Sequence, residues 1–200
     1  MKPVPTHEPL DALLASIRAC RACEAVLPLG PRPVVQAAPG ARLLIIGQAP
    51  GAKVHASGIP WSDASGERLR GWLGIDEARF HDASRIAIMP MGFCYPGRGS
   101  GGDLPPRPEC APLWHRRVLA GLPQVRLTLL VGWHAQKAML GARARTSLTE
   151  TVAAWRDYAP AALPLPHPSP RNTAWFQRHP WFAQDVLPML QARVREALSA

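Results

Sequence analysis

Short runs of apolar residues recur along the chain and are separated by segments of helical periodicity. The clearest run, residues 42–46, reads Arg-Leu-Leu-Ile-Ile and is flanked by glycines. Continuous apolar runs of this length are typical of parallel strands that are covered on both faces. The predicted strands are residues 42–46, 85–89, 126–131 and, with a weaker pattern, 162–165.

The segments between these runs carry apolar residues every three or four positions, which predicts amphipathic helices. An N-terminal helix is expected over residues 12–19, with Leu13, Leu14 and Ile17 on one face. Strands that alternate with helices predict an α/β fold, here a three-layer α/β/α arrangement with a central, mostly four-stranded parallel sheet. The other predicted helices are residues 65–73, 108–119, 134–140, 147–158 and 181–198.

The size of the chain favours one domain. Its 200 residues, 47% of them apolar, suffice for a single core and leave little room for a second. We expect a single domain over residues 1–200, in which residues 1–40 form an N-terminal helix and a cysteine-containing connector packed on the rest. No apolar stretch approaches the ~20 residues that span a bilayer, so we expect a cytoplasmic protein without membrane association. We also expect a monomer.

The charge balance favours a polyanionic partner. Lys and Arg total 23 against 14 Asp and Glu, which gives a net charge of +9. An isoelectric point near 10.4 falls in the range of nucleic-acid-binding domains. Basic composition has other origins as well, so it supports a nucleic-acid partner only together with the motifs.

Two rigid turns follow predicted strands, at the sheet edge where parallel α/β folds bind ligands. Gly47-Gln-Ala-Pro-Gly51 follows the first strand, and His167-Pro-Ser-Pro-Arg-Asn172 follows the last. Proline fixes a φ angle, and glycine lets the backbone approach a ligand closely. Either turn alone is commonly structural, but together they predict a crevice that an imidazole and a hydroxyl both face.

The two turns resemble the two motifs of the uracil-DNA glycosylase superfamily, and the resemblance extends through most of the chain. Ser57-Gly-Ile-Pro-Trp61 is similar to the segment whose aromatic residue stacks on a flipped base, and Gly92-Phe-Cys-Tyr-Pro-Gly97 corresponds to the segment after the second strand. The resemblance implies a DNA glycosylase that binds DNA, flips a deaminated base, uracil being the first expectation, and hydrolyses its N-glycosidic bond.

The cysteine spacing bears on the branch of that superfamily. In a reducing compartment, four cysteines are expected to be metal ligands or buried thiols. Four convergent thiolates suit a zinc ion or an iron-sulfur cluster equally well. The layout resembles that of the type 4 and type 5 glycosylases, which implies a 4Fe-4S cluster, with zinc as the alternative. The four cysteines are Cys20, Cys23, Cys94 and Cys110.

The chain departs from the family pattern at two places. Gln48 stands where type 4 enzymes carry a glutamate, and Ala49 follows it where the glutamine-bearing type 1 enzymes have an aspartate. Pro90 stands near the position of the asparagine that reads uracil. Two alternatives therefore stay open: a catalytically weak or inactive DNA-binding member, or a glycosylase for a different modified base.

The site residues follow from the motifs and the resemblance. His167 is expected to donate a hydrogen bond to the departing base and Gln48 to orient water. Among the carboxylates Asp63, Asp82 and Asp103, we expect Asp63 to replace the missing charge, although it also suits a helix N-cap. The expected base-binding residues are Gly47, Ala49, Pro50, Gly51, Trp61 and Pro90. The residues expected to contact DNA are Pro168, Ser169, Pro170, Arg171 and Asn172.

Overall fold

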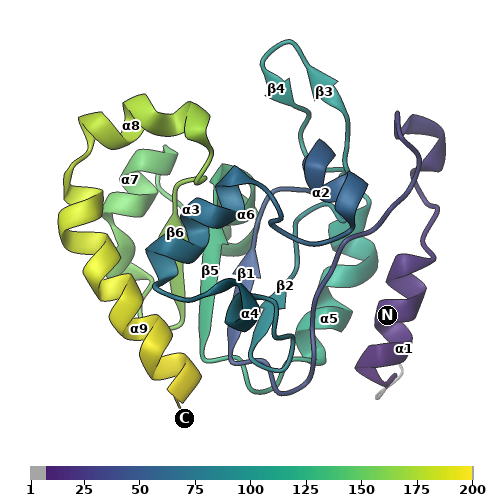
Figure 1. The fold of residues 1–200 in the computed structure, drawn as a ribbon, viewed down its shortest axis with the longest axis horizontal. Coiled ribbons are helices and arrows are strands. Elements are labelled where there is room, and N and C mark those ends of the chain that lie inside the picture. Colours follow the sequence, from purple (N-terminus) through teal and green to yellow (C-terminus); the bar gives the residue numbers. More distant parts are fainter. Residues whose placement is uncertain (1–7, 200) are drawn as a thin grey trace.

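A central sheet of four parallel strands organises the protein (Figure 1). The computed structural model describes residues 8–199. The strand order is β2-β1-β5-β6, and every neighbouring pair is parallel. The predicted four-stranded parallel sheet is therefore confirmed. The strands are β1 (Leu43–Ile46), β2 (Ile86–Ile88), β5 (Leu127–Val131) and β6 (Ala162–Leu165).

Helices cover both faces of the sheet, which confirms the three-layer α/β/α class. The α-helices are α1 (Leu10–Arg18), α2 (Ala52–Ser57), α3 (Ala64–Leu73), α4 (Glu77–Phe80), α5 (Arg116–Ala120), α6 (Trp133–Leu140), α7 (Leu148–Ala153), α8 (Thr173–Arg178) and α9 (Leu187–Ser199). Two π-helical turns, η2 (Ala111–His115) and η6 (Phe182–Val186), precede α5 and α9. Short 3₁₀ turns are η1 (Glu24–Val26), η3 (Gly141–Arg143), η4 (Trp155–Asp157) and η5 (Pro170–Asn172).

Successive residues of β1 enter different cores because side chains alternate across a strand. Leu44 and Ile46 join the core beneath α1, α5 and α6, whereas Leu43 and Ile45 join the core beneath α3, η6 and α9. All four are fully buried. This explains why the strand reads as a continuous apolar run in the sequence.

The connector before β1 covers the outer edge of β2. Gln36 exchanges two backbone hydrogen bonds with Ile88, of 3.1 and 2.7 Å, and its side-chain amide donates to the Ile86 carbonyl at 2.8 Å. Val34 N donates to the Phe93 carbonyl at 2.8 Å. Pairing of this kind protects an exposed strand edge. It also brings Val34 to the carboxyl end of the sheet.

Several elements differ from the sequence prediction. The predicted helices 108–119, 147–158 and 181–198 are each divided, with a π-helical or 3₁₀ turn joined to an α-helix. The short helices α2, α4 and α8 carry too few turns to show a helical period. The glycine-rich segment after residue 97 forms a hairpin of β3 (Arg98–Gly99) and β4 (Gly102–Asp103).

The described part of the chain contains no helix that is both long and apolar enough to cross a membrane.

The buried His115 predicts that the fold loses stability in mild acid. Its Nε2 donates to the Pro90 carbonyl at 3.2 Å, and its ring packs edge-on against Phe93. Burial lowers the pKa of His115 from its ordinary value of 6.5. Below pH 6.5 this histidine binds a proton in the unfolded chain but stays neutral in the folded chain. The free energy of unfolding therefore decreases with falling pH until the pH is below the lowered pKa as well.

Urea unfolding between pH 7.5 and 5.0 measures this effect. We expect His115→Gln to be less stable than wild type at pH 7.5. As the pH falls, however, its free energy of unfolding should decrease less steeply, by up to about 1.4 kcal/mol per pH unit. Equal slopes for the two proteins would contradict the prediction.

Candidate active site

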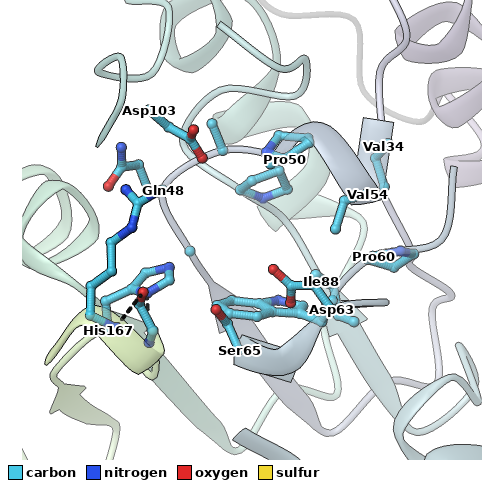
Figure 2. Close-up of a pocket in the computed structure, with 17 residues that line it drawn as sticks. Val34, Gln48, Pro50, Val54, Pro60, Asp63, Ser65, Ile88, Asp103 and His167 are labelled. Carbon is cyan, nitrogen blue, oxygen red and sulfur yellow. Dashed lines mark hydrogen bonds between the residues drawn. The ribbon is translucent and has the colours of Figure 1, made fainter. Parts of the chain in front are cut away.

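A pocket of about 230 Å³ lies at the carboxyl edge of the sheet (Figure 2). A cavity of about 150 Å³ holds a benzene ring, so this one has room for a single planar base. The turns after β1, β2 and β6 all contribute to it, together with the α2–α3 region and the β3–β4 hairpin. The lining residues are Val34, Gly47, Gln48, Ala49, Pro50, Gly51, Val54, Pro60, Trp61, Asp63, Ser65, Ile88, Pro90, Asp103, His167, Ser169 and Arg171.

The turn after β1 brings its backbone against the indole of Trp61. A Cβ atom built on Gly47 would lie 2.9 Å from Cζ2 of Trp61, closer than side chains approach. Only glycine therefore permits this contact. The indole also packs against the core that contains Leu43 and Ile45 while lining the pocket.

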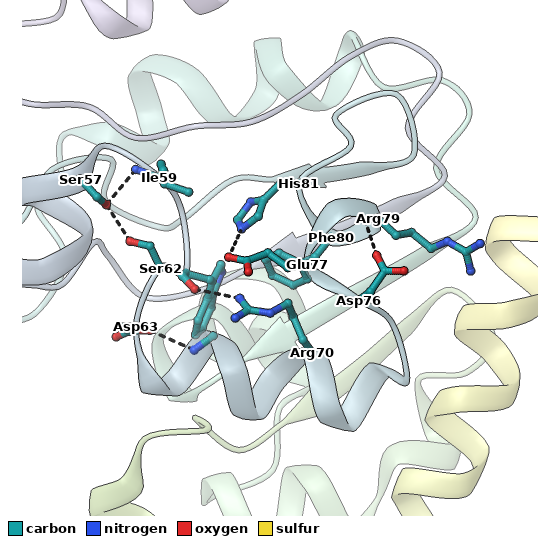
Figure 3. A network of polar contacts seen from close by, with 12 residues as sticks. Ser57, Ile59, Ser62, Asp63, Arg70, Asp76, Glu77, Arg79, Phe80 and His81 are labelled. Atoms are coloured by element: carbon teal, nitrogen blue, oxygen red, sulfur yellow. Dashed lines mark hydrogen bonds and ion pairs between the residues drawn. The ribbon is translucent and has the colours of Figure 1, made fainter.

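The loop that carries Trp61 is held in a sterically unfavourable conformation by polar contacts (Figure 3). Trp61 has a φ of 58°, which for a bulky residue costs about 1–3 kcal/mol. Its carbonyl accepts from Nη1 of Arg70 at 3.3 Å, and the hydroxyls of Ser57 and Ser62 lie 2.6 Å apart. A Cβ on Gly66 would lie 1.8 Å from the Trp61 carbonyl oxygen. The surroundings thus fix the indole before any ligand binds.

Asp63 caps α3 and lines the pocket at the same time. Its Oδ1 accepts from the Gly66 amide at 2.9 Å, so the N-cap considered in the sequence is present. The same carboxylate borders the pocket beside Trp61. Its structural role is therefore established, and its catalytic role stays a prediction.

The hydrogen bonds of His167 define which ring nitrogen carries the proton. The Ser169 amide donates to Nδ1 at 3.1 Å, so in the neutral ring the proton sits on Nε2. Asn172 Nδ2 donates to the His167 carbonyl at 2.8 Å and holds the turn closed. Burial lowers the pKa of His167, while the carboxylates of Asp63 and Asp103 raise it. The geometry thus leaves Nε2–H as the donor at the pocket.

Gln48 is oriented by the β3–β4 hairpin. Its Nε2 donates to the Leu104 carbonyl at 3.3 Å, which leaves Oε1 as an acceptor. The backbone of the same turn is fixed by bonds from Met91 N to Gly47 O and from Gly92 N to Gln48 O, at 2.9 and 3.0 Å. The turn after β1 and the segment after β2 therefore form one rigid wall.

One side of the pocket is apolar. Figure 2 shows Val34, Val54 and Pro60 together, across the pocket from Gln48 and His167. Val34 and Val54 are buried, and neither was anticipated as a site residue. Val34 belongs to a proline-rich connector, where no local pattern indicates a ligand contact. Ile88, Ser65 and Pro60 were also missed.

The predicted DNA-binding turn lies at the rim of this pocket. Ser169 and Arg171 line the pocket itself. Pro168 is buried, Pro170 is exposed, and both stiffen the turn. Arg68 in α3 donates to the Ser169 carbonyl at 3.2 Å, which fastens the turn to α3. The structure thus brings all the predicted catalytic and base-binding residues into one pocket.

The match to known proteins covers most of this architecture. A family model described as the uracil DNA glycosylase superfamily matches residues 34–191. The chain belongs to this superfamily. Membership supports a DNA glycosylase-like function, with DNA as the partner and base repair by hydrolysis as the class of chemistry.

The cysteines of this superfamily member lie partly outside the matched region. Cys94 and Cys110 fall within residues 34–191, whereas Cys20 and Cys23 precede it. All four are free thiols, and three of them are buried. Cys23 and Cys94 share a small apolar cluster with Leu27.

These thiols lie within electrostatic range of one another. Burial raises the pKa of Cys94 to about 12, and the thiols of Cys23, Cys110 and Cys20 add to the rise against a backbone hydrogen bond from Arg32. Burial likewise raises the pKa values of Cys23 and Cys110. Across residues 8–199, however, no three His, Cys, Asp or Glu side chains form a metal-binding group. The thiols share a region but do not converge on one point.

Gly47→Ala tests the contact that positions Trp61. The added methyl group must displace the indole, so we expect a loss of about 1–3 kcal/mol in the free energy of unfolding and a moved Trp61 in a crystal structure of the variant. Gly71→Ala is the matched control, because a methyl group there meets open space on α3. It should raise stability by about 0.5–1 kcal/mol. An unmoved Trp61 in a fully stable Gly47→Ala protein would show that this contact does not fix the indole.

Proposed function

We propose that this protein hydrolyses the N-glycosidic bond of a deaminated base in DNA, with uracil as the first candidate. The observation that carries the proposal is the neutral His167, whose Nε2–H borders a base-sized pocket beside Trp61. The two ring centroids are 5.6 Å apart. A base lying on the indole would present its edge to the imidazole.

His167 would act on the departing base. Cleavage leaves negative charge on the pyrimidine, mainly at its carbonyl oxygens, and a hydrogen bond from Nε2–H stabilises that charge more in the transition state than in the substrate. The bond from Ser169 to Nδ1 supports this proposal because it orients the ring and selects the donating tautomer.

Trp61 and the apolar wall would hold the base. An enzyme acting on a base must first rotate it out of the duplex, and stacking on an aromatic ring offsets part of the lost base stacking. Pro90 offers no amide hydrogen to the pocket, and its carbonyl is taken by His115. Reading of the base edge therefore falls to other groups, of which Asp63 and Ser65 border the pocket.

Gln48 would orient the attacking water through Oε1. Bond cleavage makes the sugar cationic, and two carboxylates that line the pocket are candidates for the negative charge beside it. One is Asp63, which is the one expected from the sequence and which also caps α3, and the other is Asp103. The backbone of Gly47, Ala49, Pro50 and Gly51 would form the wall against which the nucleotide rests.

The turn after β6 and the excess of basic residues would bind the DNA strand. Ser169, Arg171 and Asn172 are suited to phosphate contacts, and Pro168 and Pro170 keep the turn rigid against the duplex. A net charge of +9 adds a general attraction to DNA that weakens with salt.

Two alternative functions are favoured by specific residues. Ala49 and Pro90 replace side chains that contribute to catalysis and to base reading in the family pattern. Loss of both favours a weak or inactive DNA-binding member. Retention of the pocket and of His167, together with altered recognition of the base edge at Pro90, favours a glycosylase for another modified base.

His167→Ala separates these readings. With single- and double-stranded DNA containing uracil or hypoxanthine, we expect the variant to excise the base about 10²–10³-fold more slowly under single-turnover conditions, with DNA affinity almost unchanged. His179→Ala, which removes a histidine outside the pocket, should keep the rate. DNA binding by a wild-type protein that cleaves neither base would favour the inactive member instead.

We further propose a type 4 or type 5 branch assignment, with a 4Fe-4S cluster on Cys20, Cys23, Cys94 and Cys110. The proposal rests on the chemistry of the donors, because four thiol sulfurs are the ligands that such a cluster takes. In the described part of the chain the four thiols do not form a metal-binding group, so binding would require them to draw together. Zinc would satisfy the same four sulfurs. Either group would fasten the N-terminal segment and the Cys94–Cys110 segment to the domain.

Metal analysis of anaerobically purified protein tests this assignment. We expect a brown protein with about four irons per chain. Cys94→Ser should bleach it and lower the melting temperature by about 5 °C or more, since metal binding contributes directly to folding. A colourless protein with about one zinc per chain would establish the alternative.

A further inference from the structure

The β3–β4 hairpin carries a carboxylate to the rim of the pocket. Arg98 pairs with Asp103 and Gly99 with Gly102 in this antiparallel hairpin, which projects beyond α2 in Figure 1. This hairpin is not among the elements that the sequence predicts. In the fold, Asp103 lines the same pocket as Gln48 and His167.

The hairpin is fastened over the turn that follows β1. Leu104 closes it by donating from its amide to the Gly97 carbonyl at 2.9 Å and accepting from Gln48 Nε2 at 3.3 Å. Gly102 has a φ of +133°. A Cβ atom at this residue would lie only 2.7 Å from Nη1 of Arg171, so glycine permits the close approach of that side chain. The hairpin thus contacts both motif turns.

The Asp103 carboxylate lies above the glycine turn. Its Oδ2 is 3.5 Å from the position of a Cβ atom on Gly51. Asp103 directly precedes Leu104, whose carbonyl accepts from Gln48, and the Asp103 and Gln48 side chains line the same pocket. Asp103 also acts electrostatically on His167.

Asp63 and Asp103 occupy different parts of the pocket. Figure 2 shows Asp63 beside Ile88, where the apolar wall would receive the base, and Asp103 beside Pro50, at the rim near Gln48. A nucleotide that enters base first leaves its sugar at the rim. Asp63 is further committed to the Gly66 amide through Oδ1. The position of Asp103 is therefore the one that matches the reacting carbon of the sugar.

We propose that Asp103 is the catalytic carboxylate of this protein, supplied by the hairpin in place of the charge missing from the turn after β1. This inference rests on the proposed glycosylase function. The bond between C1′ and the base nitrogen breaks, and its electron pair leaves with the base, which accepts a hydrogen bond from His167. The oxygen of a water held by Gln48 Oε1 bonds to C1′, and the proton of that water passes to the Asp103 carboxylate.

Charge-removing variants test the proposal on the excision reaction. Asp103→Asn should slow single-turnover excision about 10²–10³-fold while leaving DNA affinity unchanged or slightly higher. Asp63→Asn is the internal comparison, because asparagine caps helices as well as aspartate does. The excision rate of this variant should fall less than about ten-fold. Asp185→Asn, an exposed substitution on η6 with the same change in net charge, should have no effect. Full activity of Asp103→Asn, or a larger loss from Asp63→Asn, would overturn the proposal.

A binding measurement tests the same charge without relying on turnover. The probes are two DNA strands that carry either a cationic pyrrolidine or an uncharged tetrahydrofuran in place of one sugar. Wild type should bind the cationic probe at least about ten-fold more tightly, and Asp103→Asn should lose this preference. No preference in wild type, or its retention in Asp103→Asn, would overturn the role of Asp103. If the preference depends on Asp103 but the protein excises no base, the position of Asp103 beside the sugar stands and the proposed function is refuted.

Discussion

The parallel pairing of β1 with strands on both of its sides is the constraint on which the candidate site depends. Leu43 is in register with Ile86 of β2 and with Leu127 of β5, so the strands run in the same direction and end at one edge. The chain proceeds from β1 to one neighbour and later returns to the other, which opens a crevice at that edge. Segments more than 100 residues apart, such as those of Gly47 and His167, meet there.

Close packing converts this crevice into a shaped pocket. The Trp61 indole lies against Gly47, and its backbone carbonyl occupies the space that a side chain at residue 66 would need. The unfavourable φ of Trp61 is tolerated because Arg70 and the cap formed by Asp63 hold the loop from the helix side. Rigidity of this kind prepares a surface for stacking before a ligand arrives, which reduces the ordering that binding requires.

The distribution of charge in the pocket differs from what the motif turns contain. The turns themselves offer no carboxylate: they bring the amide of Gln48, an imidazole that burial keeps uncharged, and the cationic side chain of Arg171. Both carboxylates come from elsewhere, Asp63 from the start of α3 and Asp103 from the hairpin. A substituted motif residue is therefore a poor guide to the charge of the finished pocket, because electrostatic effects depend on distance in space.

The sequence by itself determined the sheet, because strands buried on both faces must be apolar throughout, and it predicted β6 with the observed bounds. It also indicated the two turns, since glycine and proline act on their own backbone. It did not reveal Val34 or Val54 as pocket residues, the hairpin that places Asp103, or the tautomer of His167. These depend on contacts between segments distant in sequence, and short elements such as α2 and β3 gain their stability from such contacts rather than from local pattern. Only the tertiary structure decided them.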